Sequence, residues 1–352
     1  MTVVLVSGGS GFVGSHCVYQ LLERGYEVRT TVRSTEKKIE LIEDFSERSG
    51  LSFPKLNLQV YVADLSSDDG WEEAIDGCDY VLHVASPVPK SATKDPDDLI
   101  QPAKKGVLRV LKLSQKKKVK RVVLTSSSAS VAFAKGSNDK LLDENDWTEC
   151  LKGLNAYILS KTIAEKSAWE FINGDQNQNS EQPLELAVMN PLAIFGPSII
   201  KDKKVNSGTF NFLQVLTDGT LKRGCPKITL SVIDVRDVAK YHLEAMTEPA
   251  AKSQRFILCT RSNCLSLMGI ADILRFRIPK KYSDNLPHSE IPSFIINFCA
   301  MFLPILREVR DYLPKKYLLA EKAYRTFKWE LRPTEDAIIA GADSFFRSMD
   351  AE

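Results

Sequence analysis

The chain has 352 residues, of which 43% are hydrophobic, and its formal net charge is +2. A chain of this length and composition can bury a substantial core, so we expect a globular protein and not a disordered one. The 47 basic residues nearly balance the 45 acidic ones, which argues against nucleic acid or an anionic membrane as the partner.

Seven cysteines occur without a CxxC pair or a zinc-like spacing, which is typical of free thiols in a reducing compartment. The opening MTVVLVSGGSG has neither the basic segment nor the long apolar segment of a targeting peptide, so we expect a cytoplasmic protein. Residues 291–306 are almost all apolar but fall short of the roughly 20 residues that span a bilayer. We favour a cap helix there over interfacial membrane association or a true span.

Up to about residue 190, short apolar segments rich in β-forming residues alternate with helical segments. Strands are expected at 2–7, 27–33, 58–64, 80–86, 121–127 and 185–191, and helices at 12–24, 35–48, 69–76, 95–117 and 156–173. This alternation predicts an α/β fold, with a doubly wound parallel sheet of Rossmann type and helices on both faces.

The pattern changes after Pro191. A long loop and a helix come first, residues 230–260 then read as strand, helix and strand, and the remainder reads as helices separated by Pro-containing loops. We therefore predict a main domain over residues 1–191, to which 230–260 return. Residues 192–229 and 261–352 are predicted to form a smaller, mostly helical substrate lobe.

Three glycines, Gly8, Gly11 and Gly14, connect the first expected strand to the first helix. In this context Gly8 permits a tight turn, Gly11 lets the backbone approach a pyrophosphate, and Gly14 allows close packing of the helix on the sheet. The phosphates would lie at the helix N-terminus, where backbone N–H groups and the helix dipole favour anions. The pattern predicts dinucleotide binding; the alternative is a turn that is Gly-rich for structural reasons alone.

The residues at the end of the second expected strand indicate which nicotinamide dinucleotide binds. A carboxylate there would bind the ribose 2'-hydroxyl of NAD and repel the 2'-phosphate of NADP, but residues 31–34 are TVRS. The Arg33 guanidinium can bind a phosphate through two N–H groups, with Lys37 as a second cation. We therefore predict NADP(H), while noting that Lys37 also suits a solvated helix start.

The next strand ends supply further expected cofactor contacts. Asp64 and Leu65 follow the third strand, where the carboxylate can approach the adenine amino group or instead cap a helix. Ala85 and Ser86 end the fourth strand and Thr125 ends the fifth, so all three are expected beside the cofactor.

Tyr157 and Lys161 lie four residues apart at the start of an expected helix, and therefore on one face of it. A tyrosine hydroxyl is a weak acid near neutral pH, but a neighbouring cation stabilises its phenolate. A hydroxyl from residues 125–128, at the same sheet edge, would hold a carbonyl oxygen. The spacing alone occurs by chance on many surfaces; with the glycine turn and the serine-rich strand end it indicates a reacting centre.

Several motifs occur in one order along nearly the whole chain: SGGSGFVGSH, TVRS, ADL, HVASP, VKRVVLTSS, NAYILSKTIAEKSAW, NPLAIFGP and IDVRDVAKYHLEAM. In these motifs the chain resembles an extended short-chain dehydrogenase/reductase of the dihydroflavonol-reductase-like group, which includes fungal and bacterial aldehyde and ketone reductases. The resemblance implies catalytic roles for Tyr157, Lys161 and Ser127, with Ser126 and Ser128 as alternatives to Ser127. It implies cofactor contacts from Gly8, Gly9, Ser10, Gly11, Phe12, Val13, Arg33, Lys37, Asp64, Leu65, Pro191, Leu192 and a residue near Ser207.

The activity implied by the resemblance is NADPH-dependent reduction of an aldehyde or ketone to an alcohol, with Tyr157 as the proton donor. The site is expected to be largely apolar, lined by residues 129–135, 193–215 and 291–306. Ala132 stands where plant dihydroflavonol reductases have asparagine or aspartate, and NAYILSK keeps only the tyrosine and lysine of the cinnamoyl-CoA reductase motif NWYCYGK. Neither plant substrate is therefore favoured.

Three other functions are compatible with parts of the pattern. They are a 3-beta-hydroxysteroid dehydrogenase-like enzyme, a nucleotide-sugar epimerase or dehydratase, and a catalytically silent NADP sensor. The four histidines show no metal spacing, and we expect no metal site. A small carbonyl compound is the expected partner, and the chain is expected to be a monomer or homodimer.

Overall fold

The computed structural model describes residues 1–50, 55–87, 95–134, 141–150, 154–200, 208–260, 264–299, 301 and 317–350. Its centre is a seven-stranded sheet in which every neighbouring pair is parallel. In spatial order the strands are β12 (Gln254–Leu258), β7 (Glu185–Pro191), β5 (Arg121–Thr125), β4 (Tyr80–His83), β1 (Val3–Ser7), β2 (Glu27–Val32) and β3 (Leu58–Val62). The predicted doubly wound parallel sheet is confirmed, and β12 is the late strand that was expected to rejoin it.

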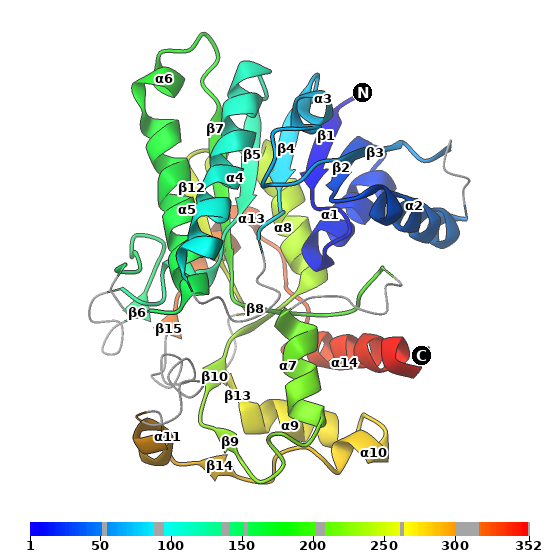
Figure 1. The fold of residues 1–352 in the computed structure, drawn as a ribbon, viewed down its shortest axis with the longest axis vertical. Helices are drawn as coiled ribbons and strands as arrows, with labels where there is room; N and C mark the ends of the chain where they lie inside the picture. Colours follow the sequence, from blue (N-terminus) through cyan, green and yellow to red (C-terminus); the bar gives the residue numbers. More distant parts are fainter. Residues whose placement is uncertain are drawn as a thin grey trace.

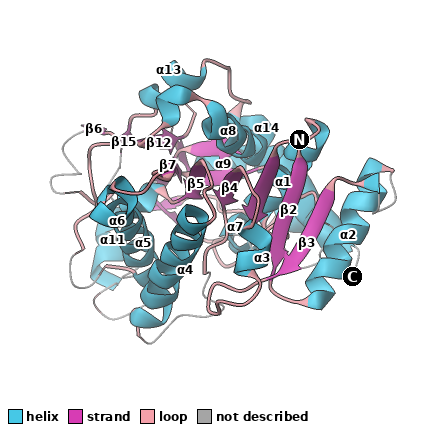
Figure 2. Ribbon diagram, turned by 90° about the horizontal axis from the view of Figure 1, so that it is seen from above, coloured by secondary structure: helices cyan, strands magenta, loops and turns pink. Residues whose placement is uncertain are grey.

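Helices cover both faces of this sheet (Figures 1 and 2). The side chains of β1 alternate, with Leu5 facing one helical layer and Val4 and Val6 facing the other. The first layer contains α3 (Trp71–Ile75), α4 (Asp97–Lys116) and α5 (Ala156–Asn173). The second contains α1 (Phe12–Glu23), α2 (Thr35–Ser49), α8 (Val235–Thr247) and α13 (Glu321–Phe327).

A second hydrophobic cluster lies beyond the carboxyl ends of the strands, in the lower part of Figure 1. It is built on the parallel pair β8 (Ala193–Phe195) and β11 (Val232–Asp234). The helices packed there are α7 (Gly208–Thr217), α9 (Leu267–Arg275) and α14 (Thr334–Asp350). The short elements nearby are β9 (Cys225–Pro226), β10 (Thr229–Leu230), β13 (Leu265–Ser266), α10 (Lys280–Ser283), β14 (Glu290–Ile291) and α11 (Ser293–Cys299).

The remaining elements are short. They are η2 (Ser128–Ser130), β6 (Leu141–Leu142), α6 (Asp175–Gln178), η3 (Pro249–Ala251) and β15 (Tyr317–Leu318). Helix α6 lies in a polar segment between α5 and β7. The buried Asn177 anchors it, because its side chain donates to the Ile172 and Leu184 carbonyls and accepts from the Leu184 N–H.

The last part of the chain contributes to both clusters. Helix α14 packs in the lower cluster, whereas Phe327 and Trp329 pack with Tyr241 and Phe256 against the main sheet. The division into a main domain and a lobe stays a prediction. None of the helices in the described ranges combines the length and apolar character that a bilayer crossing requires. Within 291–306, α11 ends at Cys299, and residues 300 and 302–306 lie outside the described part.

We expect Phe256→Ala to lower the free energy of unfolding by about 3 to 5 kcal/mol, because it leaves a cavity where a large side chain was buried. Phe256 is 0% exposed on β12, and its ring centroid lies 5.0 Å from that of Phe327. The matched control is Phe276→Ala, which truncates a side chain that is 89% exposed. Urea unfolding should show a large fall in the midpoint for the first variant and almost none for the second; equal midpoints would contradict the assignment.

Candidate active site

The glycine turn between β1 and α1 is shaped by close backbone contacts. Gly8 has a φ of +74°, and a Cβ on Gly14 would lie 2.2 Å from the Gly8 carbonyl oxygen. A Cβ on Gly9 would lie 2.1 Å from the Thr30 Oγ1. Gly11 caps α1 without a side-chain hydrogen bond, and the first turn has no acidic residue. The first N–H groups of α1 therefore have no competing side-chain anion, and the turn fits a diphosphate.

Arg33 follows β2 and is exposed to solvent. It is near enough to Asp64 for its charge to stabilise that carboxylate. Lys37, on the first turn of α2, forms an ion pair of 2.7 Å with Glu40 at the surface. Arg33 thus lies just after β2 near Asp64, and its contact with a 2'-phosphate stays a prediction, whereas Lys37 has a surface partner of its own.

Asp64 stabilises the turn that follows β3. Its Oδ1 accepts hydrogen bonds from the Ser66 N–H, at 2.7 Å, and from the Ser66 hydroxyl. These bonds, led by the one from the hydroxyl, lower the pKa of Asp64 below its usual value. Asp64 therefore caps a turn and not helix α3, which begins at Trp71. Its proposed contact with adenine stays a prediction.

A small cavity of about 20 Å³ lies at the carboxyl ends of β4 and β5. This volume is enough for about one water molecule. It is lined by both strand ends and by helices α4 and α5, and its lining residues include the predicted site residues Leu65, Ala85, Ser86, Thr125 and Lys161. The structure thus brings these five residues, from four separate segments, to one place. The glycine turn is adjacent, since a Cβ on Gly8 would lie 3.1 Å from the Ala85 Cβ.

Two buried histidines flank this edge, and both are held neutral. Burial, and secondarily the charge of Lys161, lowers the pKa of His83 to about 3. Its Nδ1 lies 2.8 Å from the Ser7 Oγ, which also accepts from the Ala85 N–H. Burial lowers the pKa of His242 to about 4. Its Nδ1 donates to the Val238 carbonyl, so its Nε2 accepts from the Thr125 hydroxyl at 2.6 Å.

Tyr157 and Lys161 occupy the first two turns of α5, and both are partly buried. Asn155 caps this helix by accepting from the Tyr157 N–H at 2.8 Å. The Lys161 Nζ lies 5.9 Å from the centroid of the Tyr157 ring. The helix thus presents a phenol and an ammonium group together, beside the cavity that Lys161 lines.

The three serines after β5 that are candidates for the catalytic serine differ in burial and in hydrogen bonding. Ser126 is buried and its hydroxyl donates to the Glu165 Oε2 at 2.5 Å. Ser127 is 8% exposed, and its Oγ accepts from the Ala129 N–H as the cap of η2. Within the described part of the chain, no acceptor is recorded for the Ser127 hydroxyl hydrogen. Ser128 lies in η2 and is partly exposed.

Pro191 and Leu192 lie where β7 ends beside β12, and the Leu192 N–H donates to the Leu258 carbonyl. Leu192 packs with Val131 and Ala134 in a small cluster behind the serine segment. Ser207 lies outside the described residues. Among the residues that are described, no group of three or more His, Cys, Asp or Glu side chains could hold a metal ion.

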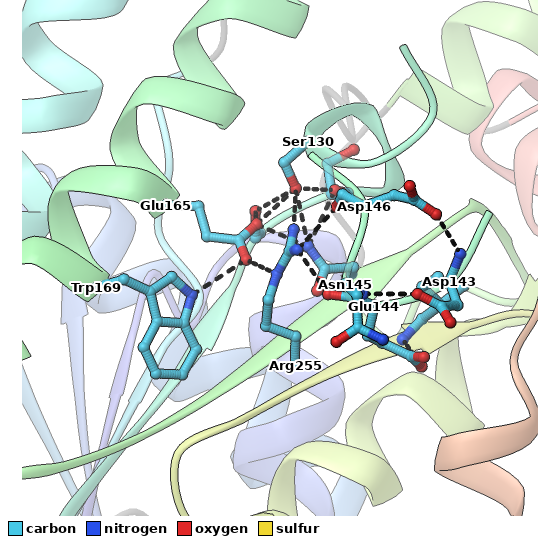
Figure 3. A network of polar contacts seen from close by, with 12 residues as sticks. Ser130, Asp143, Glu144, Asn145, Asp146, Glu165, Trp169 and Arg255 are labelled. Atoms are coloured by element: carbon cyan, nitrogen blue, oxygen red, sulfur yellow. Dashed lines mark hydrogen bonds and ion pairs between the residues drawn. The ribbon is translucent and has the colours of Figure 1, made fainter. Parts of the chain in front are cut away.

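Glu165, Asn190 and Arg255 form a buried polar network behind the serine segment; Figure 3 shows Glu165 and Arg255. Sequence analysis did not identify these residues. One available signal was the repetition of Tyr157, Lys161 and Glu165 at four-residue intervals. The other was the arginine that directly precedes the apolar residues of the strand QRFIL.

Comparison with known proteins identifies the family of the chain. The family model described as "NAD dependent epimerase/dehydratase family" matches residues 4–259. The chain is 33% identical over 303 residues to the ketoreductase azaE of Aspergillus niger, covering 82% of this chain and 86% of that protein. It is 36% identical over 293 residues to the NADPH-dependent methylglyoxal reductase GRE2 of Saccharomyces cerevisiae, covering 78% and 82%.

A solved structure of yeast methylglyoxal/isovaleraldehyde reductase Gre2 complexed with NADPH superposes with a TM-score of 0.78 at 29% identity, covering all of both chains. The matched family model spans the glycine turn, the serine segment and the Tyr157 helix. The chain therefore belongs to the NAD dependent epimerase/dehydratase family, and within it to the extended short-chain dehydrogenase/reductases of the dihydroflavonol-reductase-like group.

Proposed function

We propose that this protein is an NADPH-dependent carbonyl reductase that converts an aldehyde or ketone into an alcohol. The observation that carries the proposal is the meeting of Tyr157 and Lys161 with the serine segment and the glycine turn at one sheet edge. The protein is an NADP(H)-dependent oxidoreductase, in agreement with the relatives named for ketone and methylglyoxal reduction.

Bound NADPH would supply the hydride that the carbonyl carbon accepts. Tyr157 donates its hydroxyl proton to the carbonyl oxygen, which becomes the hydroxyl group of the alcohol product. The Lys161 ammonium stabilises the phenolate that remains on Tyr157 and is placed to bind the ribose hydroxyls. The Ser127 hydroxyl donates to the carbonyl oxygen and keeps it beside Tyr157.

Ser127 is favoured over its neighbours by the hydrogen bonds of the segment. The single hydroxyl hydrogen of Ser126 is directed to the Glu165 carboxylate, a stronger acceptor than a neutral carbonyl. The Ser127 Oγ receives the Ala129 N–H, which leaves its own hydrogen available for a substrate. Ser128 belongs to η2 and follows the cap. These contacts support Ser127 as the group that orients the carbonyl.

The substrate class follows from the surroundings of this segment. Val131, Ala132 and Ala134, in the segment that follows Ser127, have short apolar side chains that are buried. Leu192 adds a further apolar side chain from the next strand end. These residues offer no charged group to a substrate, which favours a small, largely apolar aldehyde or ketone over a nucleotide sugar.

The thiols are consistent with a protein of a reducing compartment, and we place the protein in the cytoplasm on that ground. Six cysteines in the described part of the chain are free, and burial raises the pKa of the Cys78 thiol to about 11. A buried thiol in its neutral form is a poor nucleophile, so this cysteine acts as a packing residue.

Tyr157→Phe should reduce kcat for carbonyl reduction by about 100- to 10,000-fold, because it removes the proton donor. Oxidation of NADPH is followed by absorbance with a panel of aldehydes, diketones, ketoesters and steroids. Tyr80→Phe is the matched control, since Tyr80 begins β4 at the opposite end of the sheet. If Tyr157→Phe turned over like the control, the proposed mechanism would be wrong.

Arg33→Ala should weaken NADPH binding by about tenfold or more, through loss of a charge-assisted contact with the 2'-phosphate, and leave NADH binding almost unchanged. Arg24→Ala is the control. Arg24 is also a surface arginine, but it lies at the C-terminus of α1, away from the glycine turn, and is paired with Glu244. Dissociation constants for both dinucleotides can be measured by fluorescence titration. An equal loss of affinity for NADPH and for NADH would contradict a contact between Arg33 and the 2'-phosphate.

A further inference from the structure

Glu165 continues the face of α5 on which the reacting groups lie. It follows Lys161 by four residues and Tyr157 by eight, so the three side chains run along one side of the helix. The Glu165 side chain is 0% exposed. A carboxylate in such a place is strongly disfavoured unless charge and hydrogen bonds compensate for the lost water.

Hydrogen bonds to Glu165 come from the segment that contains Ser127. The Glu165 Oε2 accepts from the Ser126 and Ser130 hydroxyls, each at 2.5 Å, and from the Asn190 amide at 2.8 Å. Ser126 and Ser130 therefore bracket Ser127 and are both attached to one oxygen atom (Figure 3 shows Ser130 with Glu165). Bonds between a hydroxyl and a carboxylate are among the stronger hydrogen bonds in proteins.

The Ser127 carbonyl lies close to the side chains of Ser130 and Asn190. The Ser130 Oγ lies 2.7 Å from the Ser127 carbonyl and 2.5 Å from Glu165, but it has one hydrogen to donate. The carboxylate is the stronger acceptor and takes this hydrogen. The Asn190 amide lies 3.2 Å from the Ser127 carbonyl and can donate to it. The backbone of Ser127 is thus held through groups that converge on Glu165.

Arg255 supplies the opposite charge. Its Nε donates to the Glu165 Oε1 at 2.6 Å, and its side chain is 8% exposed. Its Nη1 donates to the carbonyls of Glu144 and Asp146, and its guanidinium lies 3.5 Å from the centroid of the Trp147 ring. Arg255 therefore connects α5, through β12, to the loop at residues 143–149.

That loop is attached to the far side of the serine segment. The Thr148 hydroxyl donates to the Ala129 carbonyl at 2.6 Å, and the Thr148 N–H donates to the Ser130 carbonyl at 2.9 Å. The Phe133 N–H donates in turn to the Thr148 hydroxyl. The Glu165–Arg255 pair thus holds the segment twice, directly from α5 and indirectly through the loop.

We infer that Glu165 and Arg255 are positioning residues for catalysis, which fix the Ser127 hydroxyl relative to Tyr157 and Lys161. The inference rests on the proposed function, because it assigns the pair to the carbonyl-orienting serine. We assign neither side chain a contact with the substrate, although Glu165 also lines the small cavity beside Lys161. Both act on the placement of Ser127, where a displacement of about 1 Å can cost about 100-fold in rate.

The chain contains a second Arg–Glu pair that serves as a matched control. Arg121 and Glu185 form an ion pair of 2.7 Å between the first residues of β5 and β7. Arg121 also donates to the Ala245 and Glu248 carbonyls. This pair joins β5 and β7 at their amino ends, away from the reacting groups, so we expect its loss to affect stability without moving Ser127.

The decisive variant is the double replacement Glu165→Leu with Arg255→Met. Removing both buried charges avoids an unpaired one, so the fold is expected to be retained. The hydroxyls of Ser126 and Ser130 nevertheless lose their acceptor. We expect kcat to fall by about tenfold to 100-fold while the dissociation constant of NADPH changes little, since the glycine turn lies on another strand. The matched variant Glu185→Leu with Arg121→Met should keep the kcat of the unaltered protein.

A second variant removes the serine donors of the same hydrogen bonds and leaves the Glu165–Arg255 ion pair intact. Ser126→Ala with Ser130→Ala removes both hydroxyls that bind Glu165 and makes no large cavity. We expect kcat to fall by about tenfold or more. If this variant retained the kcat of the unaltered protein, or if the Glu165/Arg255 variant matched the Arg121/Glu185 control in kcat, the positioning role would be overturned.

Amide hydrogen exchange separates this inference from the proposed function. In the Glu165/Arg255 variant, exchange in the peptide covering residues 126–132 should accelerate, while exchange in the glycine turn should not. Unchanged exchange at 126–132 would overturn the inference whatever the activity. Retained turnover in Tyr157→Phe would instead overturn the catalytic assignment, because that variant leaves the network of Glu165 untouched.

Discussion

The parallel register of the seven-stranded sheet is the constraint on which the rest of the molecule depends. Because every pair of neighbouring strands runs in the same direction, their carboxyl ends share one edge. The glycine turn, the serine segment and the end of β7 are far apart in sequence, but this edge brings them together. Helix α5 then places Tyr157 and Lys161 across the ends of β4 and β5, beside the small cavity.

Chemistry at this edge requires polar groups in a protein interior, and each is stabilised in a different way. His83 and His242 avoid the cost of a buried charge by remaining neutral, and each has a hydroxyl partner on a strand end. Glu165 has both a cationic partner and several hydrogen-bond donors. The active edge is therefore supported by a layer of polar residues behind it, and not by apolar packing alone.

Short-range patterns in the sequence were enough to predict the strands of the main sheet, the long helices between them and the glycine turn. The alternation of strands and helices, the glycine turn and the four-residue spacing of Tyr157 and Lys161 are all short-range features, and the sheet they predict is the one observed. Asn190 and Arg255 could not be assigned in this way, because their partners come from other strands and helices. Likewise, Asn177 anchors α6 through contacts that its polar neighbours do not reveal.

The position of Arg255 in the chain has a consequence for how the protein matures. Glu165 and its ion-pair partner Arg255 are separated by 90 residues. Arg255 lies on β12, which is the last strand of the main sheet in chain order. During synthesis the Tyr157 helix and the serine segment are complete well before this strand emerges. Until it docks, Glu165 cannot be buried with its charge balanced. If Glu165 and Arg255 position Ser127 as inferred, a folding intermediate that lacks this edge strand is expected to be inactive.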